Sequence, residues 1–324
     1  MTSAALLTSG MTSYRALGAS SLQVFPLALG GNVFGWTADE AASFAVLDAY
    51  TAAGGNFVDT ADSYSSWIPG NEGGESETLI GAWLKSRGRR DDVVVATKVG
   101  GHPAYKGLSP DNVKKAAEAS LRRLGTDHID LYYTHFDDES VPVEDIVTAL
   151  DELVKAGHVR EIAASNISPE RLKASLDFSE REGLARYVAL QPHYNLVSRD
   201  TYEGALLDTA ADAGLAAVPY FALASGFLTG KYRPGTEVES ARAGSAAAHL
   251  ETERGRAVLA ALDAVAREQE AEIATVALAW LAARPTVVAP IASARTVGQL
   301  PALLAVANLR LTDDQMTRLT EASA

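Results

Sequence analysis

The sequence contains no cysteine. A disulfide framework, a thiolate zinc site and a cysteine nucleophile are therefore excluded. No segment approaches the roughly 18 to 20 consecutive apolar residues of a membrane span, so we expect no membrane partner. Basic residues are in the minority, with 28 Lys and Arg against 41 Asp and Glu and a formal net charge of −13. This balance argues against nucleic acid as a main partner, although helix N-termini can still bind an anionic cofactor.

The start of the chain lacks the features of a secretory signal. Residues 1–13 have neither a basic n-region nor a long apolar core, and we interpret them as a disordered leader. The 12 Pro and 26 Gly are spread along the chain rather than gathered in a linker. Residues 14–324 are therefore predicted to form a single domain. The lack of cysteine fits a reducing compartment, and we expect a cytoplasmic location.

Short apolar runs alternate with longer amphipathic segments along the chain. The runs are continuous rather than alternating, which indicates strands covered on both faces, as in a parallel sheet. There are eight of them: Leu27–Leu29, Asn56–Asp59, Val93–Thr97, Ile129–Tyr133, Ile162–Ala164, Val188–Gln191, Ala216–Pro219 and Thr286–Pro290.

The segments between these runs carry helix start and stop signals. Ser109-Pro110 and Ser168-Pro169 each indicate an N-cap followed by Pro at the first helical position. Gly125 and Gly183 close these two helices. Other helices are expected at Asp39–Ala53, Val143–Ala156, Thr252–Gln269, Ile273–Ala283, Thr296–Ala307 and Thr312–Ser323, and Ala213-Gly214 closes one more.

Eight strands alternating with helices favour a fold of the α/β class. We predict a closed (β/α)8 TIM barrel, with an open doubly wound sheet as the alternative. Extra helices are expected near the C-terminus. Tyr14–Leu17 and Leu22–Phe25 flank a short polar turn and predict an N-terminal β-hairpin that covers the bottom of the barrel.

Polar side chains follow six consecutive predicted strands, where the active site of a barrel lies. They are Asp59, Lys98, His135, Ser165 with Asn166, Gln191, and Tyr220. A buried barrel mouth holds an aspartate and a lysine only when they are paired. Asp59 and Lys98 come from adjacent strands, so we expect an ion pair. Tyr64 lies five residues past Asp59, within reach of the same mouth.

Six short motifs in this order resemble the aldo-keto reductase family over nearly the whole chain. They are Phe57–Tyr64, Ala96–Val99, Asp130–His135, Ala164–Ile167, Leu190–Leu196 and Gly226–Tyr232. Gly73–Glu77 also resembles the opening of the family's second helix. The chain is identified as a bacterial, monomer-barrel type member related to the potassium-channel beta-subunit-like branch.

The resemblance implies reduction of an aldehyde or ketone to an alcohol by hydride transfer from NADP(H), with NAD(H) also possible. Asp59, Tyr64, Lys98 and His135 match the family's catalytic tetrad. Tyr64 is the implied general acid, because negative charge builds on the carbonyl oxygen as the hydride arrives. A phenol has an ordinary pKa near 10, which a nearby ammonium lowers. Lys98 would supply that ammonium, held by Asp59, and His135 would orient the carbonyl.

The resemblance also implies a set of cofactor contacts. Their residues are Gly31, Asn32, Asp59, Ser165, Asn166, Gln191, Tyr220, Phe221, Leu223, Ser225, Lys231, Ser293, Arg295 and Gln299. Ser165, Asn166 and Gln191 would hold the carboxamide, and Tyr220 would stack on the nicotinamide ring. Arg295 would bind the 2′-phosphate, which suits a guanidinium fork.

Aromatic residues are expected around the carbonyl substrate. The predicted pocket residues are Trp36, Tyr64, Trp67, His135 and Phe136. Ala302 and Leu303 depart from the family pattern, since an acidic residue and an asparagine usually stand there near the adenine.

Three other functions stay open from the residues alone. Lys98 at a strand end would suit a Schiff-base lyase. Asp59 and His135 would suit a metal-dependent hydrolase, although such sites usually need more histidines, and we expect no metal. Some relatives of this fold bind cofactor as redox-sensing regulatory subunits. The substrate is expected to be a small-molecule carbonyl compound, and its identity, the direction of the reaction and the oligomeric state are not readable.

Overall fold

The computed structural model describes residues 14–233, 235, 238 and 243–324. The predicted leader, residues 1–13, lies outside the described residues. Eight parallel strands form one sheet in the order β10-β3-β4-β5-β6-β7-β8-β9. The strands are β3 (Ala28–Gly30), β4 (Phe57–Asp59), β5 (Val94–Val99), β6 (Ile129–Thr134), β7 (Val159–Ser165), β8 (Tyr187–Gln191), β9 (Ala216–Ala217) and β10 (Ile291–Ala292). Their residues are almost all buried, as the continuous apolar runs predict.

Hydrogen bonds between the first and last strand regions close the sheet into a barrel. Ala217 donates its backbone N–H to the carbonyl of Thr286 (2.8 Å), and Val288 donates to Ala217 (2.9 Å). Ile291 donates to Pro219, and Ala28 donates to Pro290. The predicted TIM barrel is thereby confirmed over the open sheet. We call residues 286–292, which join β9 to β3, the seam.

The eighth strand begins later than the sequence indicates. The apolar run Thr286–Pro290 predicts a strand, but β10 comprises Ile291–Ala292. Pro290 has no N–H to donate to a ladder, so regular pairing cannot pass through it. The run instead makes single bonds across the seam, and the strand starts directly after the proline.

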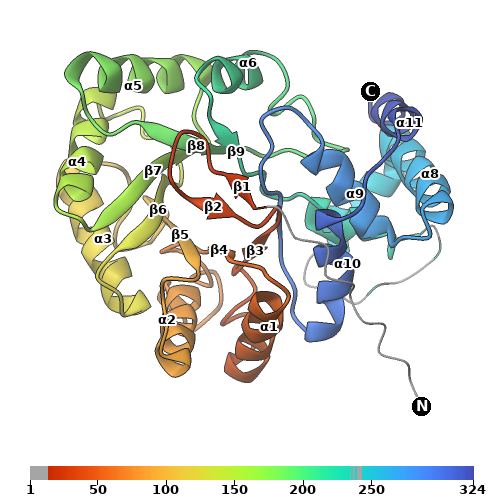
Figure 1. The fold of residues 1–324 in the computed structure, drawn as a ribbon, viewed down its shortest axis with the longest axis horizontal. Coiled ribbons are helices and arrows are strands. Elements are labelled where there is room, and N and C mark those ends of the chain that lie inside the picture. The colour runs from red at the N-terminus through yellow and green to blue at the C-terminus, as the bar shows by residue number, and fades with distance from the viewer. Residues whose placement is uncertain (1–13, 234, 236–237, 239–242) are drawn as a thin grey trace.

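The N-terminal hairpin lies across one end of the barrel (Figure 1). Its strands, β1 (Arg15–Ala16) and β2 (Gln23–Val24), pair antiparallel, which confirms the predicted hairpin. Leu17 and Val24 pack with the residues that fill the barrel interior. At the turn, Gly18 has a φ of +59°, and a Cβ there would lie 2.2 Å from the carbonyl oxygen of Val188. The hairpin thus covers the end of the barrel opposite the carboxyl ends of the strands.

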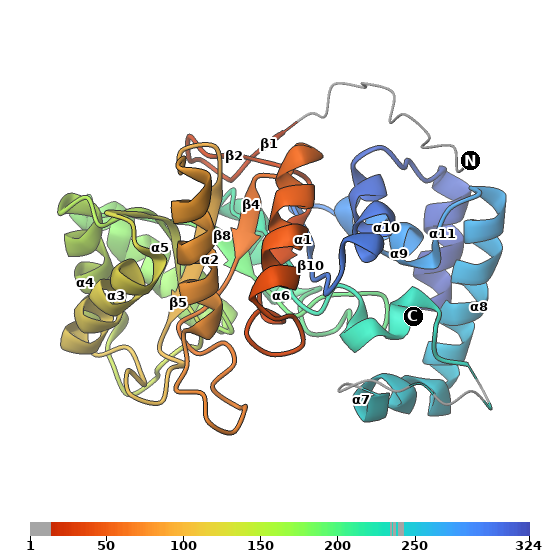
Figure 2. The same ribbon diagram turned by 90° about the horizontal axis from the view of Figure 1, so that it is seen from below.

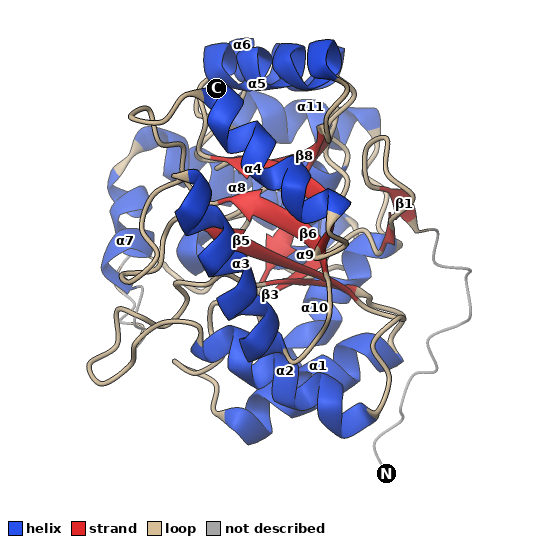
Figure 3. Ribbon diagram, turned by 90° about the vertical axis from the view of Figure 1, so that its left-hand side faces the viewer, coloured by secondary structure: helices blue, strands red, loops and turns tan. Residues whose placement is uncertain are grey.

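Helices surround the sheet on its outer face (Figure 3). They are α1 (Glu40–Ala52), α2 (Glu75–Arg87), α3 (Pro110–Leu124), α4 (Val143–Lys155), α5 (Pro169–Glu182), α6 (Ala205–Asp212), α7 (Ala243–Ala247), α8 (Glu253–Glu268), α9 (Ile273–Ala282), α10 (Leu300–Leu304) and α11 (Asp313–Ala322). Within the described residues, short 3₁₀ helices accompany them: η1 (Ala224–Thr229), η2 (Ala248–Glu251), η3 (Val297–Gln299) and η4 (Ala305–Ala307). Figure 2 shows α8 beside α11 at the end of the molecule away from α4, where the predicted extra helices lie.

Side-chain caps explain several helix starts. Ser168 accepts from the backbone N–H of Arg171, and Thr312 with Gln315 forms a capping box. Ser109 makes no such bond, although α3 still begins at Pro110. The helical stretch expected over Thr296–Ala307 is present, as three consecutive segments: η3, α10 and η4. Pro301 lies in the first turn of α10 and lacks the N–H that one continuous helix would need there.

Candidate active site

Asp59, Lys98 and Tyr64 meet at the carboxyl end of the barrel. Asp59 ends β4, Lys98 lies in the adjacent β5, and Tyr64 follows in the loop after β4. The Lys98 Nζ lies 2.9 and 2.8 Å from the two carboxylate oxygens of Asp59. It also lies 3.0 Å from the Tyr64 hydroxyl and 2.6 Å from the carbonyl of Thr60. The expected ion pair is therefore present, and the phenol is in contact with it.

The Asp59–Lys98 pair is shielded from solvent. Lys98 is 0% exposed and Asp59 is 1% exposed. Burial lowers the pKa of Lys98, while the neighbouring Asp59 carboxylate raises it. Gln191 donates to Asp59 through Nε2 at 2.8 Å, so both oxygens of that carboxylate have donors. A buried, hydrogen-bonded pair of this kind is held in one geometry.

The hydroxyl of Tyr64 lies between the ion pair and the open cavity. It is 3.3 Å from Asp59 Oδ2, and the Lys98 ammonium lies 4.7 Å from the centre of its ring. Tyr64 also lines the cavity at this end of the barrel. A phenolate formed here would face an ammonium at hydrogen-bonding distance, which favours its formation.

His135 follows β6 and is held as a neutral imidazole. Burial, with the Lys98 ammonium as the second cause, lowers the pKa of His135 to about 3. Its Nδ1 lies 3.4 Å from the hydroxyl of Ser63, and its ring centre lies 6.1 Å from that of Tyr64. A neutral imidazole offers a hydrogen bond to a carbonyl oxygen without adding a second charge beside Lys98.

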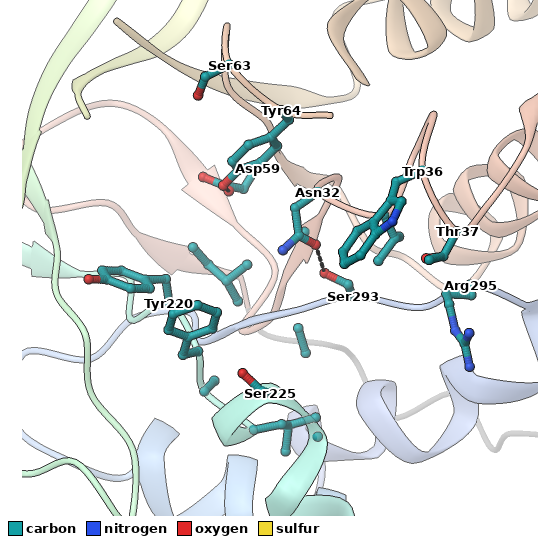
Figure 4. Close-up of a pocket in the computed structure, with 18 of the residues that line it drawn as sticks. Asn32, Trp36, Thr37, Asp59, Ser63, Tyr64, Tyr220, Ser225, Ser293 and Arg295 are labelled. Atoms are coloured by element: carbon teal, nitrogen blue, oxygen red, sulfur yellow. Dashed lines mark hydrogen bonds between the residues drawn. The ribbon is translucent and has the colours of Figure 1, made fainter. Parts of the chain in front are cut away.

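A cavity of about 810 Å³ opens at this end of the barrel, and Figure 4 shows Asp59 and Tyr64 among the residues that line it. Most of the predicted site residues line it. They are Asn32, Trp36, Asp59, Tyr64, Trp67, His135, Phe136, Ser165, Asn166, Tyr220, Phe221, Leu223, Ser225, Lys231, Ser293, Arg295 and Gln299.

Three predicted residues do not line the cavity. Lys98 lies beneath Tyr64, and Gln191 is buried against Asp59 and against the hydroxyl of Ser165. Gly31 is also buried, and a Cβ there would lie 2.8 Å from Ser76 Oγ and 3.1 Å from the carbonyl of Asp59. These three residues support the cavity-lining residues from below. Cofactor contact by Gly31 and Gln191 stays a prediction.

A hydrogen-bonded chain of cavity-lining residues runs from Tyr220 through Asn166 to His135. Tyr220 donates to Asn166 Oδ1 (2.8 Å), and Asn166 Nδ2 donates to the carbonyl of His135 (2.7 Å). Asn166 has a φ of +50°, so this amide is fixed in a conformation that few side chains adopt. One face of the Tyr220 ring stacks on His193, with centroids 5.4 Å apart. Tyr220 is thus held as a flat platform.

The far end of the cavity carries positive charge. Arg295 and Tyr220 lie on opposite sides in Figure 4, with Ser225 on the lower rim. Lys231 and Arg295 both line the cavity, and the backbone N–H of Arg295 donates to Gln299 Oε1. Ser293 donates to Asn32 Oδ1 at 2.8 Å. An aromatic platform, amide and hydroxyl groups, and then two cations fit a ring joined to phosphates, as in a nicotinamide dinucleotide.

Aromatic rings form an arc around the Tyr64 hydroxyl. Trp36 meets Trp67 edge-on at 5.6 Å, and Trp67 meets Tyr64 at 6.3 Å. Phe136 stacks on His135 at 4.5 Å. Trp67 and Phe136 are each about half exposed, 49% and 51%. Large exposed rings at a cavity mouth indicate a binding surface.

Other lining residues were missed by sequence reasoning. They are Gly30, Val33, Thr37, Ser63, Ser66, Gly101, Ala222, Gly226, Thr229, Ile291 and Ala292. Almost all of them stand within a few residues of a predicted one. Because the active site of a barrel lies at the carboxyl ends of its strands, including the whole loop after each strand in the prediction would have found most of them.

None of the helices in the described ranges is long and apolar enough to cross a membrane. Within the same ranges, no group of three or more His, Asp or Glu side chains is arranged to hold a metal ion.

Comparison with known proteins bears on this site. The family model described as "Aldo/keto reductase family" matches residues 26–324. Norsolorinic acid reductase B of Aspergillus parasiticus is 32% identical over 331 residues, covering 96% of this chain and 84% of the relative. The uncharacterized oxidoreductase YrpG of Bacillus subtilis is 36% identical over 298 residues, covering 89% and 88%. Aryl-alcohol dehydrogenase [NADP(+)] of Phanerodontia chrysosporium is 30% identical over 326 residues, covering 93% and 83%.

The family model covers most of the chain, and each of these relatives aligns over most of its own length. The resemblance carried by the six sequence motifs is thereby confirmed, and with it the expectation of an oxidoreductase on a barrel fold. The chain belongs to the aldo/keto reductase family.

Proposed function

We propose that this chain reduces an aldehyde or ketone to the alcohol with NADP(H) and that Tyr64 is the general acid. The observation that carries this proposal is the Tyr64 hydroxyl, 3.0 Å from a Lys98 ammonium that is fully buried on Asp59. The arrangement places a proton donor at the cavity surface and a fixed positive charge directly behind it. General acids positioned in this way contribute about 10²- to 10⁴-fold to rate.

Each residue of the tetrad has a distinct role in this proposal. Tyr64 gives its proton to the carbonyl oxygen as negative charge develops there, and Lys98 stabilises the phenolate that remains. Asp59 keeps the Lys98 ammonium charged and in place. The neutral His135 donates a hydrogen bond to the same carbonyl oxygen and orients the substrate.

The residues present fit a nicotinamide dinucleotide, which supplies the hydride when bound. Tyr220 would carry the ring, with Asn166 and Ser165 beside the carboxamide. Lys231 would balance the pyrophosphate charge, and Arg295 the 2′-phosphate. The preference for NADP(H) over NAD(H) rests on Arg295 and agrees with the name of the aryl-alcohol relative.

The Schiff-base alternative is disfavoured by the state of Lys98. A nucleophilic lysine must be free of its proton and accessible to a carbonyl carbon. Here the amine is 0% exposed, bound to both oxygens of Asp59 and covered by Tyr64. Borohydride trapping with a carbonyl substrate is expected to leave no adduct on Lys98.

A spectrophotometric assay with NADPH or NADH and an uncharged aromatic aldehyde tests the proposal. We expect NADPH oxidation that depends on both enzyme and aldehyde, with slower oxidation of NADH. Absence of turnover despite quenching of protein fluorescence by NADPH would favour a cofactor-binding sensor. Absence of both binding and turnover would contradict the proposal.

A further inference from the structure

A second group of ionisable side chains lies buried directly behind the catalytic lysine. Asp62, in the loop between Asp59 and Tyr64, and Glu77 of α2 are both 0% exposed. Arg123 of α3 reaches Glu77 through Nε at 2.6 Å. We call Asp62, Glu77 and Arg123 the buried triad. None of its members belongs to the tetrad or lines the cavity.

The buried triad is joined to the backbone of the catalytic lysine. Glu77 Oε1 accepts from the hydroxyl of Thr97, the residue before Lys98, at 2.5 Å. The backbone N–H of Asp62 donates to the carbonyl of Lys98 at 3.3 Å. A change of charge in the triad therefore changes the electrostatic potential at Lys98. The Lys98 ammonium is the charge that stabilises the Tyr64 phenolate.

Glycines allow this close arrangement. Gly74 precedes α2 with a φ of +84°, and a Cβ there would lie 2.3 Å from Arg123 Nε. Gly73 has a φ of +106°, and its Cβ would lie 2.8 Å from the ring of His102. The Gly73–Glu77 motif thus provides both the glutamate of the triad and the space through which Arg123 reaches it.

The Asp59–Lys98 pair and the buried triad together contain three carboxyl groups and two cations, so one carboxyl is left without a cation. Asp59 with Lys98 and Glu77 with Arg123 form two ion pairs. Asp62 is the remaining carboxyl. Among the described residues no side chain donates a hydrogen bond to either of its oxygens, although the backbone N–H of His102 lies close enough to favour its charged form. A buried carboxylate without a paired cation is costly, whereas a protonated one is tolerated.

The groups around Asp62 agree with a protonated state at neutral pH. Burial and Glu77 raise the pKa of Asp62 to about 8, against the opposing effects of Arg123, a backbone hydrogen bond from His102, and Lys98. Burial lowers the pKa of His102, and burial with Asp62 raises that of Tyr132 on β6. Neither of these neighbours therefore adds charge beside Asp62 in the neutral range.

We propose that Asp62 is a proton-bearing positioning residue, neutral in the active enzyme, whose ionisation at alkaline pH suppresses the acid function of Tyr64. An added negative charge behind Lys98 opposes the developing phenolate, because Lys98 would then be shared with a second anion. This inference rests on the proposed function.

The pH profile of Asp62→Asn tests the kinetic part. In the parent, kcat/KM for NADPH-dependent aldehyde reduction is expected to fall on an alkaline limb near pH 8, by about tenfold one pH unit above it. In Asp62→Asn the limb should move to higher pH, with values at neutral pH within about threefold of the parent. Asp91→Asn, an exposed acid, is the control and should keep the parent profile. A limb that stays in place or moves to lower pH overturns the proposal.

Glu77→Gln should act in the opposite direction. Loss of the Glu77 charge frees Arg123 to stabilise an Asp62 carboxylate, so the limb should move to lower pH. A merely structural role for the triad would lower kcat/KM in both variants without moving the two limbs apart.

A stability measurement tests the protonation of Asp62 without any assay of activity. Between its ordinary pKa and the raised one, the folded protein holds a proton that the unfolded chain has lost. The Asp62 contribution to stability is therefore full at acid pH and declines as the pH rises towards 8. Urea unfolding at about pH 5 and about pH 8.5 should show Asp62→Asn gaining stability relative to the parent at the higher pH. An equal difference at both pH values would overturn the neutral state, whether or not the enzyme reduces aldehydes.

Discussion

The Tyr64 hydroxyl contacts both Lys98 and Asp59, so its removal isolates the proton-donating step. Tyr64→Phe keeps the ring and is expected to bind NADPH normally, while kcat falls by roughly 10²- to 10⁴-fold. Fluorescence titration and steady-state assays measure the two quantities. Tyr14→Phe, which removes an exposed hydroxyl bound to Gly54, is the matched control. Turnover by Tyr64→Phe within a few fold of the parent would remove Tyr64 as the acid.

Arg295 offers the test of cofactor preference. Arg295 lines the cavity and is exposed, so the expected loss comes from a charge-assisted contact of its guanidinium with the 2′-phosphate. Arg295→Ala is expected to weaken NADPH binding roughly 10- to 100-fold and NADH binding by no more than about twofold. Arg310→Ala, an exposed arginine outside the cavity, should change neither. Equal losses for both cofactors would contradict the 2′-phosphate assignment.

The sequence predicted the residues of the candidate site better than their contacts. Strand ends and the Asp59–Lys98 pairing argument place the tetrad together, as the structure shows. The partner of Gln191 could not be foreseen, because a side chain at a strand end can turn into the barrel or towards the cavity. Gln191 turns inward and binds Asp59. The burial of Asp62 could not be predicted from the sequence either, because it depends on how α2 and α3 pack in the folded chain.

Among the elements, the turn of the N-terminal hairpin allows a prediction of how much stability a substitution of Gly18 removes. A Cβ on Gly18 would meet the Val188 carbonyl, whereas Gly54 also has a positive φ, +90°, but nothing within 4 Å of its Cβ position. Both alanine variants adopt the left-handed conformation at a cost of about 1–2 kcal/mol. Gly18→Ala should lose a further 1–3 kcal/mol, roughly, because the hairpin must move away from the barrel. Urea unfolding measures the difference, and equal losses would show that the hairpin does not pack tightly.

Element boundaries were predictable where local chemistry sets them. The helices expected over 252–269 and 312–323 are present as α8 and α11, with Thr252 and Thr312 as their N-caps. The prediction was less exact at the prolines: β10 starts only after Pro290, and the helix expected over 296–307 consists of three short consecutive segments around Pro301. The pattern of apolar residues continues through a proline, but backbone hydrogen bonding does not. The pattern alone therefore overestimates the length of the regular strand or helix.

For the whole molecule, we propose that residues 14–324 form one domain. The described strands belong to one closed barrel and to one hairpin packed against it. No group of the described strands therefore forms a separate domain. A chain that starts at Tyr14 is expected to unfold in a single transition and to keep the parent kcat/KM. Calorimetry and the aldehyde assay measure these properties. Two separate transitions, or a loss of activity on removal of residues 1–13, would contradict the single-domain proposal.

The seam where residues 286–292 close the barrel has a consequence for motion. Its one strand, β10, has two residues, as has the adjoining β9, while β5, β6 and β7 have six or seven. Fewer cooperative backbone bonds mean that amide exchange with solvent starts here rather than in the long strands. Ile291, Ala292 and Ser293 also form part of the cavity wall. The proposed dinucleotide site therefore includes the part of the barrel with the shortest strands. Binding should slow deuterium uptake first along the seam, so the ligand completes a closure that the backbone alone makes with few bonds.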